Sequence, residues 1–207
     1  MAGYAGPLTA ADLFRERTTP HDRWMTSLEQ QDLVEGLDAA RTEFHRQRTR
    51  VGQVVGHLSP TAFDAWPSAA VTSAIAEQGH FSAYDMEVGW SARLVVGHLG
   101  DSARIFAQRI HRVRTETDAV LADFVTDEDD RLARYVAADP ANLVEELGVA
   151  QDSLEAALAG IHVSDLTRTA THEVDGPLTL GDIVAFLPDH QRDHADQLSL
   201  LAGLTRG

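Results

Sequence analysis

Two histidines near the end of the chain have the spacing of a metal-binding pair. His190 and His194 are four residues apart, so in a helix both imidazoles project from the same face, about one turn apart. This spacing suits the chelation of one metal ion, as in other helical sites with two histidines. As a string the pair is weak evidence, because ten histidines in 207 residues produce such a pair by chance roughly 0.4 times per chain.

The hydrophobic pattern around the histidines strengthens the prediction. The last helical segment has an apolar stripe with steps of three and four residues, which reads Ile183, Leu187, His190, His194, Gln197 and Leu201. His98 lies on the inner stripe of an earlier segment, between Leu94 and Ile105. Burying a polar group without a partner costs about 1–3 kcal/mol. We therefore expect His98, His190 and His194 to meet inside the protein on one divalent transition-metal ion; the alternative is three ordinary core or surface histidines.

Other polar residues near these positions are candidates for supporting roles. Asp101 follows His98 by three residues, and we expect its carboxylate to accept the second N–H of a ligand histidine. Asp193 is a second candidate for this role, and a solvated helix carboxylate is the alternative for Asp101. His80 and His172 lie in loops from which a fourth ligand could come.

A site of three histidines allows two kinds of chemistry. It leaves at least one coordination position of the metal open, which is typical of catalytic rather than structural sites. The metal could lower the pKa of a bound water and deliver hydroxide for hydrolysis, or it could bind and deprotonate a thiol. The chain has no cysteine, so such a thiol must be a small molecule. It has no lysine either, which excludes a Schiff-base mechanism.

Four long helices are predicted to position these residues. We expect them at residues 32–58, 91–117 and 141–158, and from the capping box Thr179–Asp182 to Leu201. With short or irregular connections between them, this pattern indicates an all-α fold, a four-helix bundle. We expect a single domain over residues 31–207, preceded by an N-terminal extension over residues 1–30 with one short helix.

The connections are less regular. Residues 61–89 predict a long connection with one short helix, and residues 118–139 predict a further short helical piece. Residues 169–178 are turn-rich, with some residues typical of strands. Pro188 precedes His190 by two residues inside the last helix, and we expect it to kink that helix.

Charge and hydropathy exclude several classes of partner. The formal net charge is −15, without the basic surface that nucleic-acid binding needs, and an anionic membrane surface would repel the chain. We find no apolar run long enough for a transmembrane helix and no secretory signal, so we expect a cytoplasmic protein. A small-molecule substrate is the partner that remains.

Two stretches resemble a known family. The first is WSARLVVGHLGDS, residues 90–102, followed by Arg104, Phe106 and Arg109. It resembles the second helix of the DinB superfamily, in particular its YfiT-like metal-dependent hydrolases. The second runs from Leu178 through the capping box into His190, His194 and Gln197, and it resembles the last helix of that family. The resemblance covers roughly residues 31–201.

The resemblance implies a four-helix bundle with a metal site on His98, His190 and His194. Members often bind zinc or nickel, many are homodimers, and several use a low-molecular-weight thiol such as mycothiol or bacillithiol. From it we expect a metal-dependent enzyme, in the first place a mycothiol-type S-transferase acting on a small electrophile. A hydrolase that uses metal-bound hydroxide and a non-catalytic metal-binding stress protein are the alternatives.

Overall fold

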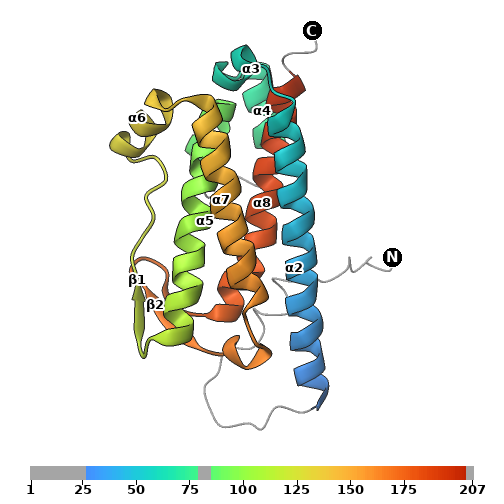
Figure 1. Ribbon diagram of the computed structural model, residues 1–207, viewed down its shortest axis with the longest axis vertical. Coiled ribbons are helices and arrows are strands. Elements are labelled where there is room, and N and C mark those ends of the chain that lie inside the picture. Colours follow the sequence, from blue (N-terminus) through green and yellow to red (C-terminus); the bar gives the residue numbers. More distant parts are fainter. Residues whose placement is uncertain (1–26, 79–84, 204–207) are drawn as a thin grey trace, which may run out of the picture.

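Four long helices run side by side in the computed structural model, which describes residues 27–78 and 85–203 (Figure 1). They are α2 (Ser27–Gly56), α5 (Ala92–Thr115), α7 (Pro140–Ala159) and α8 (Leu180–Gly203). Helix α5 packs mainly on α7 and also on α8, whereas α2 packs mainly on α8. The predicted four-helix bundle is confirmed, and His98 and the His190–His194 pair lie on two helices that contact each other.

Local signals in the sequence set the ends of these helices. The side chain of Asp139 accepts hydrogen bonds from the first turn of α7, and Pro140 occupies the first helical position, where its missing N–H costs nothing. The predicted capping box opens α8: Thr179 N donates to Asp182 Oδ2 at 2.7 Å, and Asp182 N donates to Thr179 Oγ1 at 3.1 Å. Pro188 lies inside α8, which continues on both sides of it.

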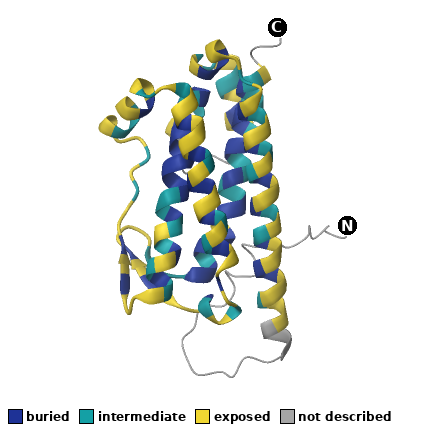
Figure 2. Cartoon of the chain, in the orientation of Figure 1, coloured by how far each residue is buried: buried dark blue, intermediate teal, exposed yellow. Residues whose placement is uncertain are grey.

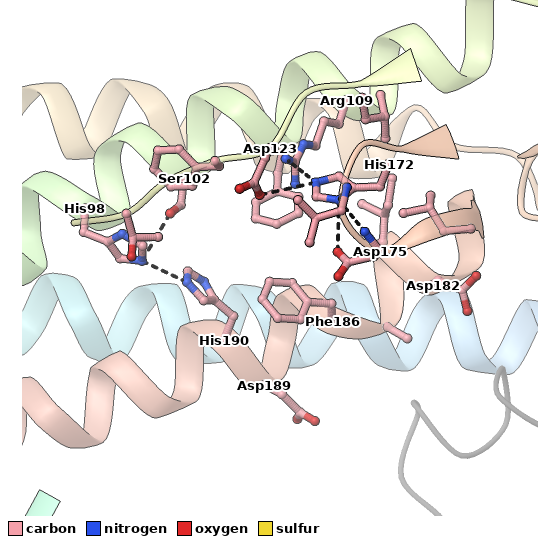
Figure 3. Close-up of a pocket in the computed structure, with 18 of the residues that line it drawn as sticks. His98, Ser102, Arg109, Asp123, His172, Asp175, Asp182, Phe186, Asp189 and His190 are labelled. Atoms are coloured by element: carbon pink, nitrogen blue, oxygen red, sulfur yellow. Dashed lines mark hydrogen bonds and ion pairs between the residues drawn. The ribbon is translucent and has the colours of Figure 1, made fainter. Parts of the chain in front are cut away.

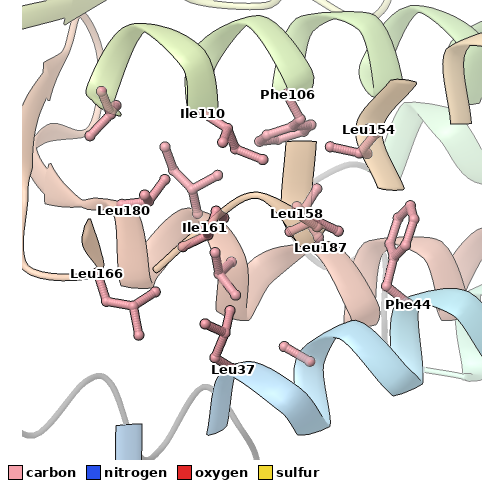
Figure 4. Close-up of a cluster of buried hydrophobic side chains, with 14 of the residues drawn as sticks. Leu37, Phe44, Phe106, Ile110, Leu154, Leu158, Ile161, Leu166, Leu180 and Leu187 are labelled. Atoms are coloured by element: carbon pink, nitrogen blue, oxygen red, sulfur yellow. The ribbon is translucent and has the colours of Figure 1, made fainter. Parts of the chain in front are cut away.

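The buried face of each helix points toward the others, and the exposed residues cover the outside (Figure 2). The apolar core has two clusters. One includes Leu37, Phe44, Ile110, Leu154 and Leu187 (Figure 4). The other includes Val51, Leu94, Leu99, Leu147 and Leu198. Along α5 and α8, the histidines fall where one cluster gives way to the other, so the polar site interrupts an otherwise apolar interior.

A small sheet, which the sequence analysis did not predict, lies beside the bundle. It consists of β1 (Ala119–Leu121), β2 (Thr169–His172) and β3 (Gly176–Thr179), in the order β1-β2-β3. Strand β2 pairs parallel with β1 and antiparallel with β3, and Leu121 lies opposite His172. Gly176 follows the turn with a φ of 78°, which favours glycine. Strands of three and four residues are too short to show a clear alternation of apolar and polar residues.

Short helices make up most of the remaining connections. They are α3 (Pro60–Asp64), α4 (Ala69–Glu77), the 3₁₀ helix η1 (Asp85–Gly89), α6 (Asp129–Ala137) and the 3₁₀ helix η2 (Val163–Asp165). The connection over residues 61–89 therefore holds more helix than the one short element that we predicted. Most of the N-terminal extension, including its expected short helix, lies outside the described residues. Among the described helices, none combines the length and apolar character that crossing a bilayer requires.

Candidate metal centre

The structure brings the three predicted histidines together. One nitrogen from each of His98, His190 and His194 lies within 4.8 Å of the others. The Nε2 atoms of His98 and His190 are only 3.1 Å apart. Figure 3 draws this contact as a dashed line. His98 and His194 are each about 1% exposed, whereas His190 is partly open to a cavity. The three-four spacing on α8 therefore places its two imidazoles opposite the one from α5.

A chain of hydrogen bonds fixes the tautomer of His194. Gln197 Nε2 donates to the backbone carbonyl of Glu87 at 2.6 Å, so the Oε1 atom of Gln197 is left as an acceptor. That oxygen lies 2.9 Å from His194 Nδ1, which must then carry the proton. The lone pair of His194 is consequently on Nε2. Support of this kind is typical of metal-binding histidines.

His98 has a more apolar environment. Its ring lies 5.3 Å from that of Trp90 and 5.8 Å from that of Phe124, measured between centroids. Ser102 Oγ lies 3.3 Å from His98 Nε2, while His98 Nδ1 is buried and has no hydrogen-bond partner among the described residues. Burying the Nδ1 atom of His98 without a hydrogen bond costs free energy. A bond from Nε2 to a metal ion would offset that cost.

Burial keeps all three imidazoles neutral. It holds the pKa values of His98 and His190 well below the usual value for histidine, and neighbouring histidines lower them further. Burial also lowers the pKa of His194 to about 4, against the opposing effect of its hydrogen bond to Gln197. Neutral imidazoles offer the lone pairs that zinc, nickel and similar ions bind. The three residues thus fit a divalent transition metal.

Glu87, in η1, adjoins the histidines and was missed in the sequence analysis. Its Oε2 atom is 3.5 Å from His194 Nε2, and its side chain is only 3% exposed. Burial raises its pKa to about 7; a hydrogen bond from Thr126 opposes this rise, and the charge of Asp127 adds to it. One feature of the sequence could have indicated it: Glu87 is a single acidic residue within the apolar stretch Met86–Trp90, immediately before α5.

Asp101 is not brought to the histidines. Its Oδ1 atom accepts a hydrogen bond from Arg104 at 2.5 Å, and its Oδ2 atom accepts from Arg131 at 2.8 Å, from Tyr135 at 2.7 Å and from Arg134. Three residues along a helix correspond to a rotation of about 60° away from His98, and that rotation turns Asp101 toward α6. The hydrogen bond that we expected from a ligand histidine is made instead by Gln197.

A cavity of about 580 Å³ opens beside the histidines. His98, His190 and Ser102 line one end of it, and Arg109 and His172 line the other (Figure 3). Between the two ends lie aromatic and aliphatic side chains, including Phe106 and Phe186, whose ring centroids are 5.4 Å apart. Strands β1 and β2 contribute to the far end, so the sheet helps to shape the cavity.

His172 is not a fourth ligand. Its Nε2 atom lies 3.0 Å from Arg109 Nη2, and its Nδ1 atom lies 3.1 Å from Asp175 Oδ2 at the far end of the cavity. The other candidate, His80, lies outside the described residues. His45, His57, His111 and His162 are exposed and lie away from the site.

Comparisons with known proteins agree with the fold. No curated protein matches the chain. A solved structure, YfiT from Bacillus subtilis, superimposes with a TM-score of 0.66 at 17% identity, over 94% of this chain and 98% of the other. YfiT is described as a probable metal-dependent hydrolase with an unusual four-helix bundle topology. The model of the DinB superfamily matches residues 43–198, a span that includes all three histidines. The chain therefore belongs to the DinB superfamily.

Proposed function

We propose that this protein is a metal-dependent enzyme that acts on a small molecule in the cavity beside His98 and His190. The observation that carries the proposal is the convergence of three neutral imidazoles, two of which, His98 and His190, line one end of a cavity of about 580 Å³. Binding sites for small molecules usually have volumes of about 300–1,000 Å³. A purely structural metal site would be closed by a fourth protein ligand, whereas this site faces open space.

The residues of the chain have distinct parts in this proposal. His98, His190 and His194 hold the ion, for which zinc and nickel are the first candidates. When bound, such an ion acts as a Lewis acid and lowers the pKa of a nucleophile that coordinates it. Gln197 keeps the Nε2 lone pair of His194 directed into the site. The aromatic rings of Phe106 and Phe186 give the cavity an apolar surface for the substrate.

We propose thiol transfer as the reaction. A low-molecular-weight thiol of the mycothiol type would lose its proton to solvent, and its sulfur would bond to a small electrophile, whose leaving group departs with the bonding electron pair. The resemblance to thiol-using members of the family supports this reaction. Because the chain has no cysteine, the thiol of such a reaction must be a small molecule.

Hydrolysis is the second candidate, and Glu87 favours it. Its carboxyl group lies beside His194, in a position to accept a proton from an attacking water. The description of YfiT as a probable metal-dependent hydrolase points in the same direction.

One experiment separates these reactions. Protein loaded with zinc or nickel is incubated with mycothiol, bacillithiol or glutathione and a panel of small electrophiles, and thiol consumption is followed. A parallel panel of esters and amides is incubated without thiol. Thiol consumption that disappears in His190→Ala supports the transferase, and cleavage without thiol supports the hydrolase. If neither panel turns over with protein that demonstrably holds metal, the enzymatic proposal is wrong and a non-catalytic metal-binding protein remains.

A further inference from the structure

The segment between β1 and α6, residues 122–128, forms one wall of the histidine site. The ring of Phe124 lies against His98, with the two planes inclined by only 13°. Thr126, in the same segment, hydrogen-bonds to the buried carboxyl group of Glu87. The segment contains neither helix nor strand, so no regular hydrogen-bond ladder fixes the place of Phe124. Something else must hold this ring against the imidazole.

Arg131, in the first turns of α6, contacts both this segment and α5. Its guanidinium carbon lies 4.5 Å from the centroid of the Phe124 ring, a distance typical of a cation–π contact. Its Nε atom donates to the carbonyl of Val125 at 3.2 Å, and its Nη1 atom donates to Asp101 Oδ2 at 2.8 Å. Its Nη2 atom also donates to Glu128 Oε2 at 3.3 Å, so the planar guanidinium makes four contacts at once, which a single-point donor cannot do.

We propose that Arg131 is a positioning residue for the histidine site, which acts by holding Phe124 flat against His98, with Asp101 as its anchor on α5. The contacts run from Asp101 through Arg131 and Phe124 to His98, although Asp101 itself does not touch a histidine. Asp101 thereby supports the site through the wall of the cavity rather than through a hydrogen bond to a ligand.

The chain offers a matched control in Arg134, one turn further along α6. Arg134 also donates to Asp101 Oδ2, but its guanidinium lies over the ring of Tyr135 and not over Phe124. Replacing either arginine by glutamine removes one positive charge and one donor to Asp101. Only Arg131→Gln removes the contact with Phe124. It also removes the hydrogen bond to Val125 and a positive charge that acts on His98, so Phe124→Leu, which keeps that charge, is needed beside it.

The direct test uses NMR of the metal-free protein with labelled histidine. The ring current of a stacked phenyl group displaces the imidazole signals of His98, which are assigned by their loss in His98→Gln. We expect Arg131→Gln and Phe124→Leu each to shift the His98 signals toward those of an unstacked imidazole, and Arg134→Gln to leave them in place. The proposal is overturned if Arg131→Gln or Phe124→Leu leaves the signals unmoved, or if Arg134→Gln moves them as far as Arg131→Gln does.

A second readout uses Co²⁺ and rests on the proposed metal site. The visible absorption of bound Co²⁺ reports the geometry of its ligands. We expect Arg131→Gln to change the band shape and Arg134→Gln to retain that of the wild type; equal spectra for all three proteins would contradict the positioning role. If the wild type binds no Co²⁺, the proposed function fails, and the NMR measurement still decides the role of Arg131.

Discussion

Two polar clusters lie on α5 only three residues apart, and they are built in opposite ways. Around His98 the three imidazoles are neutral, one nitrogen of His98 has no hydrogen-bond partner among the described residues, and the cluster opens onto a cavity. Around Asp101 the groups are charged, and the carboxylate accepts hydrogen bonds from three arginines and a tyrosine. His98 and Asp101 are both buried, so the burial of the central residue does not distinguish the two clusters.

The difference suggests that the two clusters have different roles, one in the stability of the fold and the other in ligand binding. A buried ion whose donors and acceptors are all paired holds the helices in place but has nothing to offer a ligand. Neutral lone pairs that face one another, beside open space, contribute little to the fold and are ready to bind a cation. Apart from the positioning role proposed for Arg131, we therefore expect the Asp101 cluster to serve stability and the His98 cluster to serve binding, and four predictions test this comparison.

The largest expected effect is on stability. Asp101→Ala leaves the hydroxyl of Tyr135 and the guanidinium of Arg131 without their acceptor, so the free energy of unfolding should fall by about 2–3 kcal/mol. His190→Ala in metal-free protein should change it by less than about 1 kcal/mol. Urea denaturation measures both values, and equal losses would remove the distinction between the clusters.

A methyl group added at Gly97 should also destabilise the fold. A Cβ atom there would overlap the ring of Tyr135, which is fully buried and cannot move aside, so Gly97→Ala should cost about 1–3 kcal/mol. Gly100→Ala is the control, because its Cβ atom would lie at an ordinary distance of 3.6 Å from Leu147, and alanine favours the helix. Thermal unfolding of the two variants should shift in opposite directions; a shared direction would count against the packing argument.

A smaller effect is expected at the support of His194. Gln197→Leu removes the acceptor that fixes the tautomer of His194, and we expect metal affinity to fall about 10-fold. Gln191→Leu is the matched control on the same helix, since the Nε2 atom of Gln191 is buried without a hydrogen-bond partner among the described residues. Competition titration with a chromogenic chelator measures both affinities. Unchanged binding by Gln197→Leu would show that this hydrogen bond does not serve the metal site.

The smallest effect concerns pH. Burial alone would raise the pKa of Asp101, but hydrogen bonds from Tyr135 and the three arginines outweigh it, and the pKa lies below the ordinary value. A carboxyl group with a lowered pKa in the folded state stabilises the fold above the ordinary pKa of about 4 and loses this contribution as the pH falls further. The stability difference between wild type and Asp101→Asn should therefore shrink when the pH drops from 5 to about 3. A constant difference would contradict the proposed charge on Asp101.

The sequence predicts what lies on the long helices and little of what lies between them. His98, His190 and His194 follow the apolar repeats of α5 and α8, and residues on such repeats meet once the helices pack. Glu87 and Phe124 lie in η1 and in an irregular segment, where no periodicity indicates the direction of a side chain.

For Asp101, the sequence pattern predicts the position on the helix but not the partners of the side chain. Its position on α5 was predicted well, but its partners depend on where α6 lies against α5, and the repeat within one helix carries no information about that. The same holds for the sheet, because β1 pairs with β2 across some fifty residues of chain.

The central claim is that His98, His190 and His194 hold one metal ion. Elemental analysis of the purified wild type beside His190→Ala and Asp101→Asn tests it most directly. We expect about one zinc or nickel ion per chain in the wild type and in Asp101→Asn, and almost none in His190→Ala. Equal metal content in the wild type and His190→Ala would contradict the account.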